Sequence, residues 1–282
     1  MAATPSSFRP GAALPVTAAV TAVLALAWSG VLDRPSEAYL DAALLGAGAI
    51  YATARAINGL VSVLQGTEFS IPMLSFTIGE FLDPVNDLVE RFSAVMMLAL
   101  GSLALQKVLL ALVTDRLFNL MLTVVGIAAA VASAGGPAAL RRGLLLAFTL
   151  FAAARLALVL AALAAGWTDQ LFLAGEERAR HAQMQDFRGE LEQVGRSAGV
   201  SLEDGAEGEQ SGLGDRLRGM GELRPQLAAL GERVDAFASN LITLLAALLL
   251  KTVLLPLLFL YALLRLVRRA FTARVPLPRQ GA

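Results

Sequence analysis

Residues 117–137 read LFNLMLTVVGIAAAVASAGGP, and this stretch decides the class of fold. Its apolar portion, residues 117–134, contains no charged side chain and ends in Gly135-Gly136-Pro137, a strong helix breaker. A helix of this length nearly matches the hydrocarbon core of a bilayer, which is roughly 30 Å thick. The stretch therefore predicts a transmembrane helix, and with it an integral membrane protein.

Five further apolar runs are also long enough for membrane helices. They are residues 12–32, 43–64, 92–113, 143–166 and 240–266. Hydrophobic residues make up 56% of the chain and charged residues only 16%, whereas a typical soluble domain is about 25% charged. We therefore predict an all-α integral membrane protein with about six transmembrane helices in the lipid bilayer. Because 23 basic and 23 acidic residues balance, we expect no nucleic-acid partner.

The first run, residues 12–32, follows a short segment with one basic residue, Arg9. An apolar core after a basic start is also typical of a signal peptide. The run is long for that role, and no clear small-x-small cleavage site follows it. We therefore expect an uncleaved transmembrane helix.

The second run, residues 43–64, is the least hydrophobic, because it contains Arg55 and Asn58. Polar or small residues recur around it at steps of three, four and seven, which places them on one face of a helix. These residues are Asp41, Gly48, Tyr51, Arg55, Asn58, Ser62 and Gln65. Such a helix either lies in the membrane interface or turns its polar stripe toward the interior of a bundle.

The distribution of arginine predicts the orientation, because cytoplasmic flanks are enriched in basic residues. If all six runs cross, the N-terminus, residues 66–91, the Arg141-Arg142 loop and the basic tail share one side. That side holds Arg9, Arg91, Arg141, Arg142, Arg265, Arg268, Arg269, Arg274 and Arg279. The short loops of the other side hold only Arg34 and Arg116. Removing residues 43–64 alone from the count would place two arginine clusters outside, so we predict six crossings and cytoplasmic termini.

A polar segment, residues 175–239, separates the first five predicted membrane helices, within residues 1–174, from the last helix and basic tail, residues 240–282. Its first half carries an apolar stripe at helical spacing, Met184, Phe187, Leu191 and Val194. A second stripe comprises Leu213, Leu217, Met220, Leu223, Leu227, Leu230, Val234, Phe237 and Leu241. We predict an extramembrane helical hairpin on the periplasmic side. Either its two arms pack on each other, or the apolar seam binds a protein partner or forms a homo-oligomer.

Residues 66–91 are too short for another crossing and read as a re-entrant or interfacial segment. Asp83 has the residue type of a helix N-cap, and Pro84 that of a first helical position. The acidic residues of the segment are Glu68, Glu80, Asp83, Asp87 and Glu90, against one base, Arg91.

Some of this region resembles a known family. Arg55-Ala-Ile-Asn58, Gln65-Gly-Thr-Glu68 and residues 79–92, GEFLDPVNDLVERF, are similar to a family of uncharacterised bacterial inner-membrane proteins. The resemblance covers roughly residues 55–92. It implies a location in the bacterial inner membrane and supplies no activity, cofactor or binding residue.

The sequence lacks the residues that several kinds of metal and catalytic site require. There is no cysteine, so disulfides, thiolate nucleophiles and cysteine-bound metals are excluded. His181 is the only histidine, which excludes a metal site with two histidines, and we expect it to be a solvated surface residue. No HExxH, GxSxG or P-loop pattern occurs. We therefore expect no enzyme, no metal and no cofactor.

Four basic residues lie within the predicted spans: Arg55, Lys107, Arg155 and Lys251. A cation near the bilayer centre costs about 2.5–3.5 kcal/mol on insertion scales, and no acidic residue lies within the spans. A re-entrant segment 66–91 would bring Glu80 or Asp83 to Arg55 or Lys107. Alternatively, the cations donate hydrogen bonds to backbone carbonyls, or they line a hydrated electropositive path. The candidate path residues are Arg55, Asn58, Lys107, Arg155 and Lys251.

Two classes of function follow from these features. The basic residues favour a channel, a transporter or a transport-accessory subunit for a small polar or anionic solute, since electropositive walls attract anions. The alternative is a non-transporting scaffold or signalling protein whose periplasmic hairpin, residues 175–239, binds a partner or self-associates.

Overall fold

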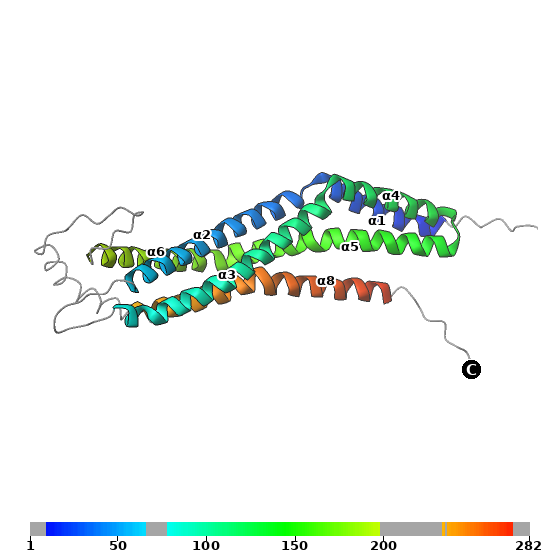
Figure 1. Cartoon of the computed structure of the whole chain (residues 1–282). Coiled ribbons are helices and arrows are strands. Elements are labelled where there is room, and N and C mark those ends of the chain that lie inside the picture. The colour runs from blue at the N-terminus through cyan, green and yellow to red at the C-terminus, as the bar shows by residue number, and fades with distance from the viewer. Residues whose placement is uncertain (1–9, 66–77, 198–232, 235, 273–282) are drawn as a thin grey trace, which may run out of the picture. The chain divides into compact units, whose positions relative to one another are not determined.

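The computed structural model describes residues 10–65, 78–197, 233–234 and 236–272, and it is all-helical over these ranges (Figure 1). The elements in chain order are α1 (Pro10–Ser29), α2 (Asp33–Gln65), α3 (Ile78–Thr114), α4 (Arg116–Gly135), α5 (Ala138–Thr168), the π-helical turn η1 (Asp169–Leu173), α6 (Ala174–Ser197), a helical segment over residues 236–249, the π-helical turn η2 (Leu250–Leu254) and α8 (Leu255–Thr272). Within the described ranges no strand occurs, which confirms the predicted all-α class.

Among the residues that the structure describes, five helices are long and apolar enough to cross a membrane. They are Asp33–Gln65, Leu82–Thr114, Arg116–Gly135, Ala138–Arg196 and Ala236–Ala262, and a shorter apolar helix covers Leu14–Ser29. Each of the six predicted runs thus coincides with a helix, and length and composition support a membrane protein. Of the predicted hairpin, α6 and residues 236–239 are helical, whereas residues 198–232 lie outside the described ranges.

The helix around Asp83 differs from the prediction. It begins at Ile78 rather than after a cap at Asp83, and it continues through Pro84 to Thr114. Asp83 instead accepts a hydrogen bond from Gln65 Nε2 at 2.8 Å. Pro84 is the seventh residue of this helix, so its missing N–H removes the helical hydrogen bond to the carbonyl four residues earlier, and the helix continues past it nevertheless. The described portion of segment 66–91 is therefore continuous with the helix predicted over residues 92–113.

The described helices divide into two compact units. Unit 1 comprises Met1–Ala43, Leu103–Thr168 and Val253–Ala282, and unit 2 comprises Leu44–Ser102 and Asp169–Thr252. The long helices α2 and α3 therefore each contribute one portion to each unit.

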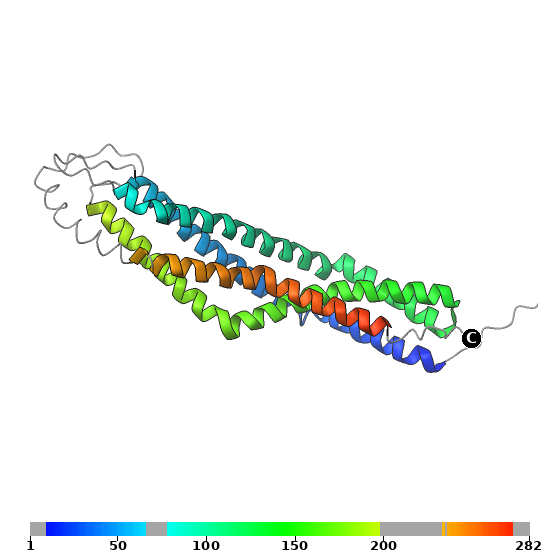
Figure 2. The same ribbon diagram turned by 90° about the horizontal axis from the view of Figure 1, so that it is seen from below.

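In unit 1, α4 packs against α1 and α5, and α5 also packs against α8 (Figures 1 and 2). The core between α1, α4 and α5 contains Val20, Ala27, Leu122, Ala129, Phe148 and Ala152. Gly126 permits this close approach, because a Cβ there would lie 3.1 Å from both the Phe148 ring and Val20. Small residues of this kind let apolar helices approach closely in a bilayer.

In unit 2, four helical segments share one apolar interior: residues 44–65, residues 78–102, α6 and residues 236–249. The buried side chains recur at steps of three and four along each segment, the spacing of one helix face. They include Ile50, Ile57, Leu64, Val85, Val89, Phe92, Met96, Met184, Phe187, Leu191, Val194, Phe237, Leu241, Leu244 and Leu248. Phe187 stacks on Phe237 with ring centroids 4.0 Å apart. The seam predicted on α6 is therefore buried within the fold.

The polar stripe of α2 faces outward. Arg55 and Ser62 are exposed and Asn58 is half-buried, whereas Ile50, Ile57 and Leu64 on the opposite face are fully buried. Of the two predicted placements, a stripe turned toward the bundle interior is thus wrong, because the apolar face of the helix fills the interior of unit 2.

Candidate functional site

Arg155 on α5 is the most deeply buried cation of unit 1, with only 3% of its side chain exposed. Its Nη2 lies 2.6 Å from Asp33 Oδ2 and also donates to the Ala27 carbonyl oxygen at 2.8 Å. Nη1 donates to the Val113 carbonyl oxygen. Every acceptor in this set comes from a different helix: α2, α1 and α3.

The two carbonyls explain why an arginine is placed there. Ala27 lies in the last turn of α1 and Val113 in the last turn of α3. The last four carbonyls of a helix lack intrahelical donors, and a cation at that end also interacts favourably with the helix dipole. Arg155 therefore caps two helices while its charge is balanced by Asp33. The predicted role as a donor to backbone carbonyls is confirmed for this residue.

Lys107 on α3 forms an ion pair with Asp41 on α2. Both side chains are about half exposed, at 51%. Exposed pairs of this kind contribute about 0–1 kcal/mol, because solvent screens them. Lys107 thus pairs with an acid of α2, a partner that none of the alternatives from the sequence had assigned to it.

Lys251 is the buried cation of unit 2 and lies in the π-helical turn η2. Its Nζ is 2.8 Å from Asp169 Oδ1, at the start of η1, and donates to Glu177 Oε2 at 2.9 Å. The exposed fractions of the three side chains are 6%, 15% and 13%. Two carboxylates against one ammonium leave a formal charge of −1. π-Helical turns are rare, and they often mark positions where a side chain has been redirected.

His181 lies one turn beyond Glu177 and is not the solvated surface residue that we expected. It is half-buried, and its Nε2 lies 3.0 Å from Thr53 Oγ1 on α2. Burial lowers the pKa of His181, and the nearby Glu177 carboxylate opposes that change only in part. The imidazole is therefore neutral at pH 7.

Pro256 explains a further polar contact next to Lys251. Proline has no backbone N–H, so the carbonyl of Thr252, four residues earlier, loses its helical donor. Ser102 Oγ on α3 donates to this carbonyl at 3.0 Å. A neighbouring helix thus supplies a hydrogen-bond donor to this carbonyl.

The five candidate path residues do not share one set of contacts. In unit 1, Lys107 and Arg155 meet different acids, Asp41 and Asp33, which lie about two turns apart on α2. In unit 2, Lys251 is buried between two carboxylates, whereas Arg55 and Asn58 lie on the outward stripe of α2. The premise of unpaired cations is therefore wrong for Lys107, Arg155 and Lys251.

Asp41 was among the acids that the sequence placed near the cations, on the polar stripe of residues 43–64. Sequence reasoning missed the other three acids that neutralise them: Asp33, Asp169 and Glu177. One signal was present, since Asp33 directly follows the first apolar run and Asp169 lies three residues beyond the fifth.

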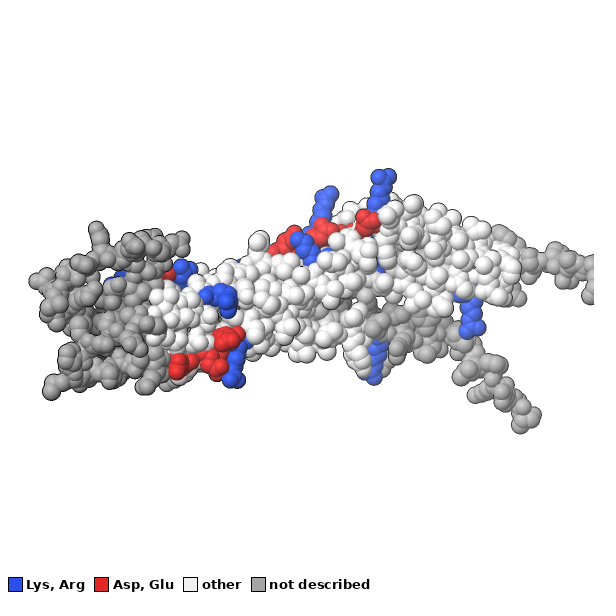
Figure 3. Space-filling view, in the orientation of Figure 1, with Lys and Arg blue, Asp and Glu red and all other residues white. Residues whose placement is uncertain are grey.

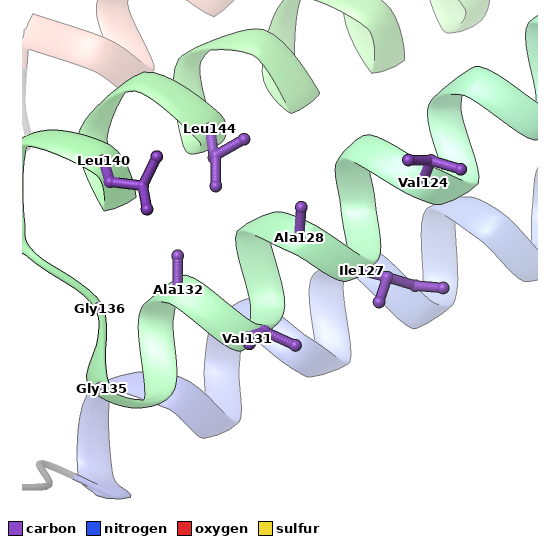
Figure 4. A pocket seen from close by; sticks show the side chains of 9 residues that line it. All are labelled: Val124, Ile127, Ala128, Val131, Ala132, Gly135, Gly136, Leu140 and Leu144. Carbon is purple, nitrogen blue, oxygen red and sulfur yellow. The ribbon is translucent and has the colours of Figure 1, made fainter.

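A groove on unit 1 lies between α4 and α5 (Figure 4). Its lining is apolar throughout: Val124, Ile127, Ala128, Val131, Ala132, Gly135, Gly136, Leu140 and Leu144. Such a lining offers nothing to a polar or anionic solute. Over the described ranges, no group of three or more acidic or histidine side chains is arranged to hold a metal ion.

The chain matches no protein-family model, no curated protein and no solved structure. Any function therefore rests on the contacts of the described residues.

Proposed function

We propose that the protein is a non-transporting scaffold of the bacterial inner membrane, whose extramembrane helices bind a protein partner. One observation carries this proposal: Arg155 and Lys251, the two buried cations of the apolar runs, are each held by carboxylates of the same fold. This neutralisation removes the reason to favour transport of an anion.

The energetic argument is a competition between two anions for one cation. A passing anion would have to displace Asp33 from Arg155, or Asp169 and Glu177 from Lys251, at contacts of 2.6–2.9 Å. The resident carboxylates are tethered, so they bind without the loss of translational freedom that a free anion incurs. The pairs therefore favour a static fold over a conducting path.

The outer face of α6 supports the binding of a protein partner. Its apolar seam is buried in unit 2, so a partner must use the exposed side. That side carries both signs of charge and several amides: Glu176, Arg178, Gln183, Gln185, Asp186, Arg188, Gln193 and Arg196. The pairs Arg180–Glu176 and Arg188–Glu192 order some of this face. Mixed charge on a rigid helix suits recognition of a complementary protein surface.

Flux measurements test the first half of the proposal. The purified chain is reconstituted in liposomes, and efflux of chloride and of phosphate is compared with protein-free vesicles. We expect no difference. Efflux that is specific to the wild type and lost in Lys251→Met, with the variant still folded, would establish transport instead.

Cross-linking in cells tests the second half. A photoreactive amino acid is placed at Gln183 or Asp186 on the exposed face of α6, and at Val124 on α4 as a control. We expect one discrete protein adduct at the α6 positions, which mass spectrometry identifies as a second copy or another protein. The absence of any adduct at both α6 positions would overturn the binding role.

A further inference from the structure

We infer that the lipid bilayer surrounds only α1, α4, α5 and α8, so that the chain crosses the membrane four times and α2 and α3 stand outside it. This inference rests on the membrane location in the proposed function and replaces the six crossings expected from hydropathy. Three independent observations support it: the position of charge, the lengths of the helices and the direction of the connections.

The first observation is that charge is absent from the four proposed crossings except at one paired site. Residues 10–29, 117–135 and 253–264 contain no charged side chain, and residues 143–168 contain only Arg155. Figure 3 shows the corresponding uncharged surface over α1 and α4. Its exposed large side chains on α4 are Leu117, Leu120, Met121, Val124, Ile127 and Val131. A surface of this composition is matched by lipid acyl chains.

The exposed faces of α2 and α3 differ from this surface. Within residues 43–64 and 92–113, the portions that six crossings would place in lipid, these faces expose Arg55 and Lys107. Each of these two cations would cost about 2.5–3.5 kcal/mol at the bilayer centre. In water the same side chains stay hydrated and incur no such insertion cost.

The second observation is the length of α1 and α4. Each has 20 residues, or about 30 Å, which matches a hydrocarbon core roughly 30 Å thick. α2, α3 and α5 have 33, 37 and 31 residues, or about 50, 55 and 46 Å. A part of each of these three helices must therefore lie outside the hydrocarbon core.

The third observation is the connection between α3 and α4. Only Asp115 separates Thr114 from Arg116, and its backbone is extended with φ −61° and ψ 151°. Antiparallel helices are joined by loops of about 2–5 residues, so one residue does not reverse the chain. Within unit 1, α4 accordingly leads away from the end of α3 instead of returning along it (Figure 1). Two crossings over 92–113 and 117–134 would require that reversal.

The connection between α1 and α2 has three residues, so its length alone would permit a reversal of the chain, and the direction of α2 decides. Gly30, with φ 62°, ends α1, and α2 begins only three residues later at Asp33. Within unit 1, the start of α2 also leads away from α1 (Figure 1). A chain that crosses in α1 therefore continues away from the bilayer in α2.

Four crossings preserve the arginine distribution. The two crossings removed, residues 43–64 and 92–113, follow each other in the chain. The number of crossings before the Arg141-Arg142 loop and before the tail from Arg265 onward therefore stays even, and both remain on the same side as before. Only Arg91 changes sides. The positive-inside bias therefore fits four crossings as well as six.

Single-cysteine labelling tests the topology, because the chain contains no cysteine of its own. Asp87, exposed on α3, lies on the cytoplasmic side for six crossings and on the periplasmic side for four. We expect Asp87→Cys to react with a membrane-impermeant maleimide in intact spheroplasts within about twofold of Gln185→Cys. Arg142→Cys should react only after permeabilisation, and Val124→Cys should resist in both conditions.

Labelling of Asp87→Cys only after permeabilisation would overturn four crossings. Ser62→Cys on α2 provides a second measurement if Asp87→Cys does not accumulate in the membrane. The maleimide should label this cysteine if α2 lies in water, and should fail to label it if α2 lies in the bilayer. The flux assay does not depend on this result, so a wrong topology and a wrong function are distinguishable.

Discussion

Replacing Arg155 with leucine tests whether this side chain holds the ends of three helices together. The substitution keeps an apolar stem of similar length but removes the guanidinium. Asp33, whose side chain is only 16% exposed, then keeps its charge without a partner. The carbonyls of Ala27 and Val113 lose their donors at the same time.

The expected loss follows from the burial of the pair. Breaking a buried ion pair by removing one partner costs about 3–5 kcal/mol, since the other charge stays in a poorly solvated place. Asp33→Asn should cost less, about 1–3 kcal/mol, because Arg155 retains both carbonyl acceptors. Replacing Arg155 and Asp33 together by leucine should restore some of the loss, since no uncompensated charge remains.

The assay is unfolding in detergent, followed by circular dichroism as a function of temperature or denaturant. For a chain of this size about 1 kcal/mol corresponds to a Tm change of about 2–4 °C, so Arg155→Leu should lower the Tm by about 10 °C. Arg142→Leu, an exposed arginine on the same helix, is the matched control and should change the Tm little. An unchanged Tm for Arg155→Leu, or a double variant with no recovery, would refute the reasoning.

Three further predictions concern unit 2 and the outer ion pair. Lys251→Met should lower the free energy of unfolding by about 3–5 kcal/mol, because two carboxylates stay buried, whereas Lys107→Met should change it by less than about 1 kcal/mol; chemical denaturation compares the two. Burial lowers the pKa of His181 in the folded chain, so as the pH falls the imidazole is protonated in the unfolded chain before it is protonated in the folded one. The contribution of neutral His181 to the free energy of unfolding should therefore be complete above the unfolded pKa of about 6.5 and decrease below it. His181→Gln should remove this pH dependence when unfolding is measured at pH 7.5 and 5.5. Ser102→Ala should cost about 0.5–1.5 kcal/mol by removing the hydrogen bond to the Thr252 carbonyl, and adding Pro256→Ala, which restores the backbone N–H, should recover most of it; a loss that persists would contradict this account.

The helices were predictable from the sequence because each is encoded locally. An apolar run of about 20 residues, as in residues 117–134, specifies a helix whatever surrounds it. The buried seam of Met184, Phe187, Leu191 and Val194 was predictable for the same reason, since helical spacing places these residues on one face.

The partners of the cations were not predictable, because they depend on contacts between distant segments of the chain. Arg155 and Asp33 are 122 residues apart, and Lys251 and Glu177 are 74 apart. Helical periodicity cannot show such pairs. The start of α3 was misplaced for a different reason: Asp83 and Pro84 have the residue types of a helix start, but the apolar face that continues through Leu82, Val85 and Val89 extends the helix upstream.

The difference between six and four crossings shows what hydropathy measures. It reports whether a run is long and apolar enough to cross, and both α2 and α3 satisfy that condition. It does not report whether the chain reverses between two runs, which here depends on the single residue Asp115. With α2 and α3 in water, Arg55 and Lys107 need no partner in lipid, and Arg155 is the only charge left within a crossing. The guanidinium of Arg155 lies at the C-terminal ends of α1 and α3, where it donates hydrogen bonds to two backbone carbonyls and pairs with Asp33. The same ion pair that argues against an anion path therefore also neutralises the one charge of the proposed crossings.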